Sequence, residues 1–191
     1  MTLFEQKAAA RKIATTIRKV AHQALAETAP TLLASQRFPA RPTLSCHIVS
    51  GFFPFRSEID TRALLGRLAG EGWTTCLPIV LGEGLPLEFR RWLPGEPTIK
   101  NVMNIDRPDE NAAVVEPDVL IVPLLSFDAK GFRLGYGGGF YDRTLAKLRA
   151  KKTVIAIGAA YSAQQVESVL HDAHDQPLDY VMTEVELIKC G

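Results

Sequence analysis

The segment from Asp118 to Arg143 constrains the fold of this chain more than any other. It opens with a continuous apolar run, Val119–Val122, which Pro123 closes; the run is short and β-branched enough to be a buried strand. A polar, glycine-rich loop follows, and Phe140–Arg143 then leads into Thr144–Leu148, a stretch typical of a helix. A strand, a glycine loop and a helix in this order predict one unit of a parallel α/β sheet.

The loop itself predicts a phosphate site. Its glycines stand at positions 131, 135, 137, 138 and 139. Glycine permits positive φ and lets an anion approach the backbone, and the unpaired amides and positive dipole end of the following helix attract negative charge. Arg133 and Arg143 flank the loop as further donors. For the glycines alone, a mobile surface connection is the alternative.

The loop belongs to neither of the two commonest nucleotide motifs. A dinucleotide fingerprint beginning at Gly135 needs glycine at position 140, where Phe140 stands, and an acidic residue in the next strand, which Val154–Ala160 lacks. A Walker A loop needs Gly-Lys-Ser/Thr, which the sequence does not contain. We therefore expect a third kind of phosphate loop.

Composition excludes several classes of protein. A chain of 191 residues suits one domain, residues 1–191. The net charge is +1 and no run of Lys or Arg exceeds two, so we expect no nucleic-acid partner. No apolar run approaches the ~20 residues that span a bilayer, and the N-terminus lacks a signal-peptide pattern, so we expect a cytoplasmic protein without membrane contact. Cys46, Cys76 and Cys190 lack metal spacing and are expected to be reduced thiols, the first two buried in strands.

The remaining elements alternate between strands and helices. Helices are predicted at residues 2–27, within 28–43, from Glu58 to about Gly70 after an N-cap at Ser57, and at Ala163–Leu170. Strands are predicted at Leu44–Ser50, Trp73–Val80, Thr153–Ala160 and Asp179–Met182, with Leu87–Leu93 as an antiparallel arm and 94–116 as an irregular excursion. The pattern predicts a three-layer α/β fold: an open, mostly parallel sheet with helices on both faces and a small antiparallel arm.

Two other stretches carry candidate site residues. Lys7 and Arg11 are four apart on the first helix and project from one face, although a solvated face has the same spacing. Phe53, Phe55 and Glu58 follow a strand at the sheet edge where α/β proteins bind ligands. A first-turn carboxylate such as Glu58 can also simply complement a helix dipole.

Together these stretches form a pattern that resembles one enzyme family. Its centre is the glycine loop with the strand before it: Leu120–Pro123, Phe127-Asp128 and Gly131-x-Arg133-Leu134-Gly135-x-Gly137-x-Gly139-Phe140-Tyr141-Asp142-Arg143. Further matches are Lys7, Arg11, Phe53, Glu58, Pro78, His174-Asp175 and Thr183-Glu184. In this order they strongly resemble the signature of the 5-formyltetrahydrofolate cyclo-ligases, also called 5,10-methenyltetrahydrofolate synthetases. The chain departs from it at Gly138, where many members have Lys, and at Met103, where relatives often have an aromatic residue.

The resemblance implies an enzyme that takes reduced folate and ATP, with Mg²⁺, and that converts 5-formyltetrahydrofolate to 5,10-methenyltetrahydrofolate; we expect it to act as a monomer. It implies catalytic roles for Arg133, Tyr141 and Asp142, with Asp142 also the metal ligand. It implies an ATP site formed by Lys7, Arg11, Arg133, Leu134, Gly135, Tyr136, Gly137, Gly138, Gly139, Phe140, Tyr141 and Arg143. It implies a folate site formed by Phe53, Phe55, Glu58, Met103 and Tyr141.

Other classes of function stay open at this point. A paralogue that binds folate or nucleotide without catalysis would share the same sequence pattern. A sugar-phosphate isomerase or a CoA-transferase would need a carboxylate base or nucleophile, for which Asp128 and Glu116 are available. An NAD-dependent enzyme is disfavoured by Phe140 and by the missing ribose-binding acid.

Overall fold

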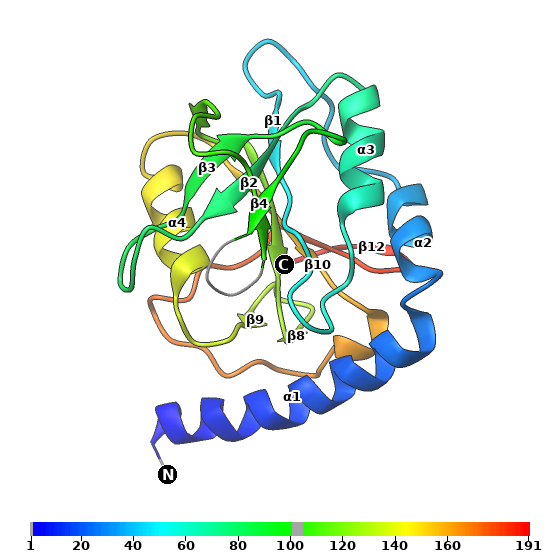
Figure 1. The fold of residues 1–191 in the computed structure, drawn as a ribbon. Helices are drawn as coiled ribbons and strands as arrows, with labels where there is room; N and C mark the ends of the chain where they lie inside the picture. The colour runs from blue at the N-terminus through cyan, green and yellow to red at the C-terminus, as the bar shows by residue number, and fades with distance from the viewer. Residues whose placement is uncertain (1, 101–104) are drawn as a thin grey trace.

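A computed structural model describes residues 2–100 and 105–191 of the chain (Figure 1). At its centre is an eight-stranded sheet in the order β12-β11-β10-β7-β1-β2-β3-β6. These strands are β1 (Ile48–Ser50), β2 (Thr74–Ile79), β3 (Glu88–Arg91), β6 (Val114–Val115), β7 (Val119–Pro123), β10 (Ile155–Ala159), β11 (Tyr180–Met182) and β12 (Leu187–Lys189). The inner strands from β11 to β2 are parallel; β12 and β3 pair antiparallel with the strands at either edge of this group, and β6 pairs antiparallel with β3. The predicted mostly parallel sheet and the β3 arm are both confirmed.

Helices cover both faces of this sheet. They are α1 (Leu3–Leu25), α2 (Ala29–Ser35), α3 (Arg62–Gly70) and α4 (Phe140–Arg149). In β7, Val119 and Ile121 belong to the hydrophobic cluster of α2 and α3, whereas Leu120 and Val122 belong to that of α4. Because both faces of β7 are covered, every position in its central run is apolar. The predicted three layers are confirmed, with α2 and α3 on one side and α4 on the other (Figure 1).

The order of the strands fixes where loops converge. The chain passes from β1 to β2 on one side of the sheet and later enters β7 on the other side of β1, so the direction of winding reverses between β1 and β7. Ligands of open α/β sheets bind outside the carboxyl ends of the strands at such a point. The loop after β1 contains Phe53, Phe55 and Glu58, and the segment after β7 leads to the glycine loop. Helix α1 crosses this end of the molecule, beside β8 and β9 (Figure 1).

The predicted start of the third helix is wrong. Helix α3 begins at Arg62, not at Glu58, and its N-cap is Thr61. The Thr61 hydroxyl donates a 2.6 Å hydrogen bond to the carbonyl of Phe52, which holds residues 51–61 as a loop over the sheet edge. Ser57 is not a cap, since its hydroxyl accepts a hydrogen bond from Arg18. Tertiary contacts therefore override the local capping pattern.

The predicted helix at Ala163–Leu170 is also wrong, because only Ser162–Gln164 forms a single 3-10 turn. The backbone beyond it is bound to the hairpin of β8 (Ser126–Phe127) and β9 (Arg133–Leu134). Val166 donates 2.8 Å to the Phe127 carbonyl, and Val169 donates 2.9 Å to the Asp128 carboxylate. These two amides are therefore already hydrogen-bonded to the hairpin and are not available for the hydrogen bonds of a helix. The hairpin and the last strand, β12, were not predicted.

Smaller differences lie elsewhere. The first strand is shorter than predicted and begins at Ile48, and Cys46 lies before it, half-buried and outside any strand. Cys76 is buried in β2, as predicted. The excursion at 94–116 contains β4 (Ile99–Lys100) paired with β5 (Asp106–Arg107), and β6. Among the helices that the structure describes, none has the length and apolarity needed to cross a bilayer.

Candidate functional site

The glycine loop leads directly into the N-terminus of α4. Gly139 is the N-cap at φ +65°, and Gly137 has φ +100°, so both adopt left-handed backbone that favours glycine. Arg143 donates a 2.6 Å bond to the Gly138 carbonyl, and its guanidinium lies 5.3 Å from the centroid of the Phe140 ring. Arg143, which lies in α4, therefore stabilises the conformation of the glycine loop that precedes this helix. The first amides of α4 have no intrahelical acceptor, which makes this turn suitable for an anion.

Arg133 and Asp142 form an ion pair beside this turn. Nη2 of Arg133 lies 2.7 Å from Oδ1 of Asp142, and Nη1 donates to the Gln176 carbonyl. The Gln176 amide donates 3.0 Å to the same Asp142 oxygen. Burial lowers the pKa of Arg133, and the charge of Asp142 opposes that shift. The structure thus brings two of the three predicted catalytic side chains into contact.

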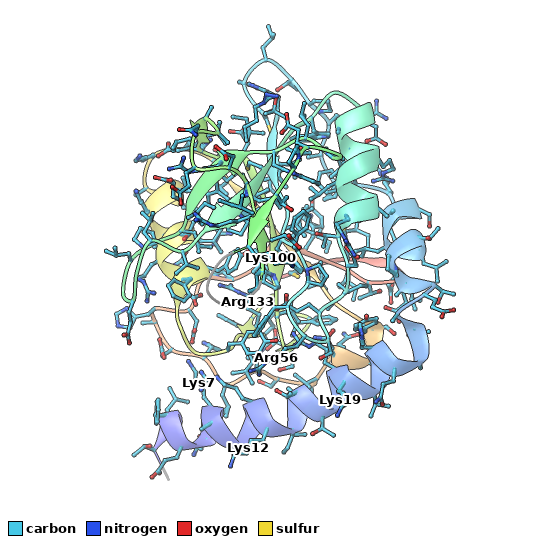
Figure 2. All side chains as sticks on the ribbon, viewed as in Figure 1. Lys7, Lys12, Lys19, Arg56, Lys100 and Arg133 are labelled. Carbon is cyan, nitrogen blue, oxygen red and sulfur yellow. The ribbon has the colours of Figure 1, made fainter. Side chains whose placement is uncertain are left out.

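Helix α1 supplies the two predicted N-terminal cations. Lys7 Nζ lies 2.6 Å from Asp175 and 3.0 Å from Asp172. Although burial lowers the pKa of Lys7, its hydrogen bonds to these carboxylates leave that pKa above its ordinary value. Arg11 donates 3.0 Å to the carbonyl of Gly135, so it contacts the glycine loop directly. Lys7 points toward the body of the protein (Figure 2).

The predicted folate carboxylate, Glu58, is enclosed next to the same loop. It is 5% exposed, accepts a 2.8 Å bond from the Phe55 amide and lies 3.6 Å from Arg18. Burial raises the pKa of Glu58 to about 7, against the opposing effects of the Phe55 amide and the Arg18 charge. Burial and the Glu58 charge also raise the pKa of Tyr141, so that its hydroxyl is a neutral donor. Glu58 and Tyr141 therefore interact, although 83 residues separate them along the chain.

The two predicted phenylalanines lie on different sides of this carboxylate. The ring of Phe55 packs edge-on at 6.0 Å against Tyr136 of the glycine loop. The ring of Phe53 packs edge-on at 5.1 Å against Trp92. Leu134 is buried in β9, so only its backbone is available to a ligand. Met103 lies outside the described residues.

Arg18 is the site residue that the sequence analysis missed. It is 1% exposed in the middle of α1 and donates 3.2 Å to the Ser57 hydroxyl and 3.2 Å to the Leu124 carbonyl. It also donates to the Tyr136 hydroxyl. A signal was present, since position 18 follows Arg11 by seven residues, two helical turns, and so projects from the same face.

The two carboxylates considered for rival reactions have other partners. Asp128 is buried and accepts hydrogen bonds from the amides of Lys130, Phe132 and Val169, which fixes the turn between β8 and β9. Glu116 pairs with Lys151 at 2.5 Å on the surface. Neither arrangement resembles a catalytic base beside a ligand site.

A metal site made of protein side chains alone is absent from the part of the chain that the structure describes, where no three His, Cys, Asp or Glu residues are grouped. A single half-buried carboxylate, Asp142, stands in the first turn of α4. Mg²⁺ is commonly held by one or two carboxylates together with substrate phosphates and water. Asp142 beside a phosphate-binding turn fits that donor set.

Comparison with known proteins identifies the family of this chain. A family model described as the 5-formyltetrahydrofolate cyclo-ligase family matches residues 4–184. The chain belongs to this family. The cyclo-ligase of Haemophilus influenzae is 41% identical over 66% of this chain and 70% of its own length, and that of Escherichia coli K12 is 37% identical over 74% and 80%. The resemblance predicted from the glycine-loop signature is confirmed, and with it the prediction of a ligase of folate metabolism.

Solved structures show the same fold. The 5,10-methenyltetrahydrofolate synthetase of Aquifex aeolicus superposes with a TM-score of 0.66 over 93% of this chain and 92% of its own, at 24% identity. The synthetase of Mycoplasma pneumoniae gives a TM-score of 0.68 over 93% and 98%, at 22% identity. At these identities the likeness speaks for the fold, and the cyclo-ligase architecture of the chain is thereby confirmed.

Proposed function

We propose that this chain converts 5-formyltetrahydrofolate and ATP to 5,10-methenyltetrahydrofolate, ADP and phosphate. Family membership supports the folate reaction. The observation that carries the two-substrate arrangement is the link from Glu58, in the loop after β1, through Arg18 to Tyr136, in the glycine loop between β9 and α4. This link supports a site in which a carboxylate suited to pterin N–H groups lies near a turn suited to phosphate.

The chemistry needs this juxtaposition. The formyl group of the substrate is an amide, which is a poor electrophile with a poor leaving oxygen. Transfer of the γ-phosphoryl group to the formyl oxygen releases ADP and makes that oxygen a good leaving group. N10 then attacks the formyl carbon, phosphate departs with the oxygen, and the N10 proton is lost to solvent. Phosphoryl transfer depends mainly on positioning and charge neutralisation, which agrees with a site that has cations and amides but no nucleophile–base pair.

Lys7, Arg11 and Arg133 are proposed to bind phosphates with the amides of residues 135–139. Because Gly138 replaces the lysine found in many relatives, these cations and Arg143 carry more of the charge neutralisation. Lys7 now contacts Asp172 and Asp175, so ATP would compete with carboxylates for it. The lining by Tyr136, Phe140 and the backbone of Leu134 completes the proposed nucleotide site.

Asp142 is proposed to hold Mg²⁺ together with ATP. Its Oδ1 accepts from Arg133 and Gln176, and Oδ2 takes part in neither bond. When bound, Mg²⁺ would neutralise charge on the phosphates during transfer. Arg133 keeps the Asp142 carboxylate in place.

On the folate side, ionised Glu58 is proposed to accept pterin N–H groups. Phe55 and Phe53 would contact the flat ring, and the neutral hydroxyl of Tyr141 would donate at the meeting point of the two substrates. Met103 is proposed as a further folate contact. We propose that the protein acts as a cytoplasmic monomer on these small molecules, without nucleic acid.

The proposal is tested by near-ultraviolet absorbance, because methenyltetrahydrofolate absorbs there. Purified protein with 5-formyltetrahydrofolate and Mg²⁺ is expected to give a rising signal only after ATP is added. A non-catalytic folate- or nucleotide-binding paralogue would bind a ligand and give no ATP-dependent signal. That second outcome would reject the proposed activity.

A further inference from the structure

Arg18 is a charged side chain in an unusual place for a helix that crosses the surface. Its side chain is 1% exposed, and its donors reach the Ser57 hydroxyl, the Leu124 carbonyl and the Tyr136 hydroxyl, with Glu58 at 3.6 Å. Burying a guanidinium costs free energy unless its donors are paired. An aliphatic residue at this position would serve packing more simply, so the charge calls for an explanation beyond the core.

The partners of Arg18 belong to both halves of the site. Ser57 and Glu58 lie in the loop that follows β1, on the folate side. Tyr136 lies in the glycine loop, on the ATP side, and Leu124 follows β7. One rigid, planar guanidinium therefore bridges the two loops that the chain topology brings to the switch point.

We infer that Arg18 is a positioning residue that holds Glu58 and Tyr136 in one arrangement, so that folate and ATP bind with positive coupling. This inference rests on the proposed function above. A ligand that orders Glu58 also orders the guanidinium, and through it the hydroxyl end of Tyr136. Coupling of this kind is reciprocal, so each substrate raises the affinity for the other by the same factor.

The charge of Arg18 also controls the state of Glu58. Burial raises the pKa of Glu58, and Arg18 is the positive group that opposes this. Among the described residues, the hydroxyls of Tyr136 and Tyr141 also interact with Glu58, and the Arg56 guanidinium lies over the Phe55 ring. Without Arg18 the pKa of Glu58 would rise further, so a smaller fraction of the carboxylate would be ionised at neutral pH to accept pterin N–H groups.

The first test needs no substrate. The pKa of Glu58 is measured by ¹³C NMR of labelled carboxyl groups, with Glu58→Gln to assign the signal. In Arg18→Met the pKa of Glu58 is expected to rise by about one unit or more, as loss of a close opposite charge implies. In Arg18→Lys, which keeps the positive charge, the pKa of Glu58 is expected to stay close to its wild-type value. A folded Arg18→Met variant with an unchanged Glu58 pKa would overturn the inference.

The second test measures coupling. The Kd of 5-formyltetrahydrofolate is determined with and without a non-hydrolysable ATP analogue. The Kd without the analogue divided by the Kd with it is expected to exceed one in wild type and in Lys19→Met, an exposed neighbour on α1. It is expected to approach one in Tyr136→Phe, which removes the hydroxyl from the bridge, and in Arg18→Lys, whose ammonium lacks the planar fork. Wild-type coupling in both variants would overturn the inference.

The two tests separate this inference from the proposed function. A wild-type protein that binds both ligands with coupling but gives no methenyltetrahydrofolate refutes the activity and leaves the role of Arg18 supported. An active enzyme whose Arg18→Lys and Tyr136→Phe variants keep full coupling refutes the role of Arg18 alone. Arg18→Lys decides the matter if Arg18→Met does not fold.

Discussion

Nη2 of Arg133 lies 2.7 Å from Oδ1 of Asp142, which joins the end of β9 to the first turn of α4. The pair places a buried guanidinium against the carboxylate proposed to hold Mg²⁺. Asp142 also benefits from its place near the positive end of the helix dipole. The cation and the candidate metal ligand therefore depend on each other for position.

Asp142→Asn and Arg133→Ala are expected to lower kcat by roughly 10²-fold or more, a loss typical of removing one charge-stabilising group. Steady-state absorbance assays measure the effect, with circular dichroism to confirm folding. Glu110→Gln is a matched control, because it removes another Arg–carboxylate pair, the surface contact with Arg107, and is expected to keep wild-type kcat. Turnover close to wild type in both site variants would remove Arg133 and Asp142 from these roles.

Lys7→Met is expected to raise the KM for ATP about tenfold or more, since a charge-assisted bond to phosphate contributes roughly 1.5–3 kcal/mol. Lys12→Met is the control, because Lys12 lies on the same helix but points away from the body of the protein (Figure 2). KM measurements for ATP at saturating folate distinguish the two. Equal KM values for the two variants would show that Lys7 serves only its bonds to Asp172 and Asp175.

Gly139→Ala is expected to weaken ATP binding and to destabilise the fold by about 1–2 kcal/mol, the cost of left-handed backbone for a residue with a Cβ. The added Cβ would also lie 2.6 Å from Nη1 of Arg143. Gly66→Ala in α3 is the control, since its Cβ meets nothing within 4 Å and alanine favours a helix by about 0.5–1 kcal/mol. Urea unfolding and ATP titration measure both. If Gly139→Ala kept wild-type stability and wild-type affinity for ATP, the turn would not require glycine at this position.

Glu58 is expected to make stability depend on pH. Its pKa is about 7 in the fold against an ordinary value of 4.5, so between these pH values the folded protein keeps a proton that the unfolded chain releases. The free energy of unfolding therefore falls as pH rises through this window, by on the order of 3 kcal/mol, and levels off above it. Urea unfolding of wild type and Glu58→Gln across this range measures the difference. If the free energy of unfolding changed with pH equally in wild type and in Glu58→Gln, the raised pKa of Glu58 in the folded protein would be contradicted.

The ionisation of Glu58 is also expected to make folate binding depend on pH. If folate binds the ionised form of Glu58, as proposed, the Kd of 5-formyltetrahydrofolate is expected to rise about tenfold for each pH unit below 7. In Glu58→Gln the Kd is expected to be higher and flat over this range. Titrations at several pH values measure it, and a Kd that stays constant in wild type would remove Glu58 from the site.

The sequence predicted the features that depend on local pattern. The all-apolar run of Val119–Val122 indicated a strand covered on both faces, and the glycines before Phe140 indicated a helix N-terminus; both are confirmed. The spacing of Lys7 and Arg11 placed both on one face of α1; in the structure Arg11 contacts the glycine loop, and Lys7 contacts Asp172 and Asp175 in the segment between β10 and β11.

The features that sequence could not predict arise from contacts between distant segments. Ser57 has a cap-like pattern, yet its hydroxyl is bound by Arg18 from α1. Residues 163–170 have a helical pattern, yet the Val166 amide pairs with the Phe127 carbonyl and the Val169 amide with the Asp128 carboxylate. Arg18 resembles a solvated helix residue until the loops that bury it are placed, and only the fold shows that it joins Glu58 to Tyr136.

The most direct test of the account follows the oxygen of the formyl group. 5-Formyltetrahydrofolate carrying ¹⁸O in that group is converted by the enzyme with unlabelled ATP, and the released phosphate is examined by mass spectrometry. If the glycine turn presents the γ-phosphoryl group to the folate held beside Glu58, the phosphate will carry the ¹⁸O label. Unlabelled phosphate, released alongside methenyltetrahydrofolate, would contradict the account.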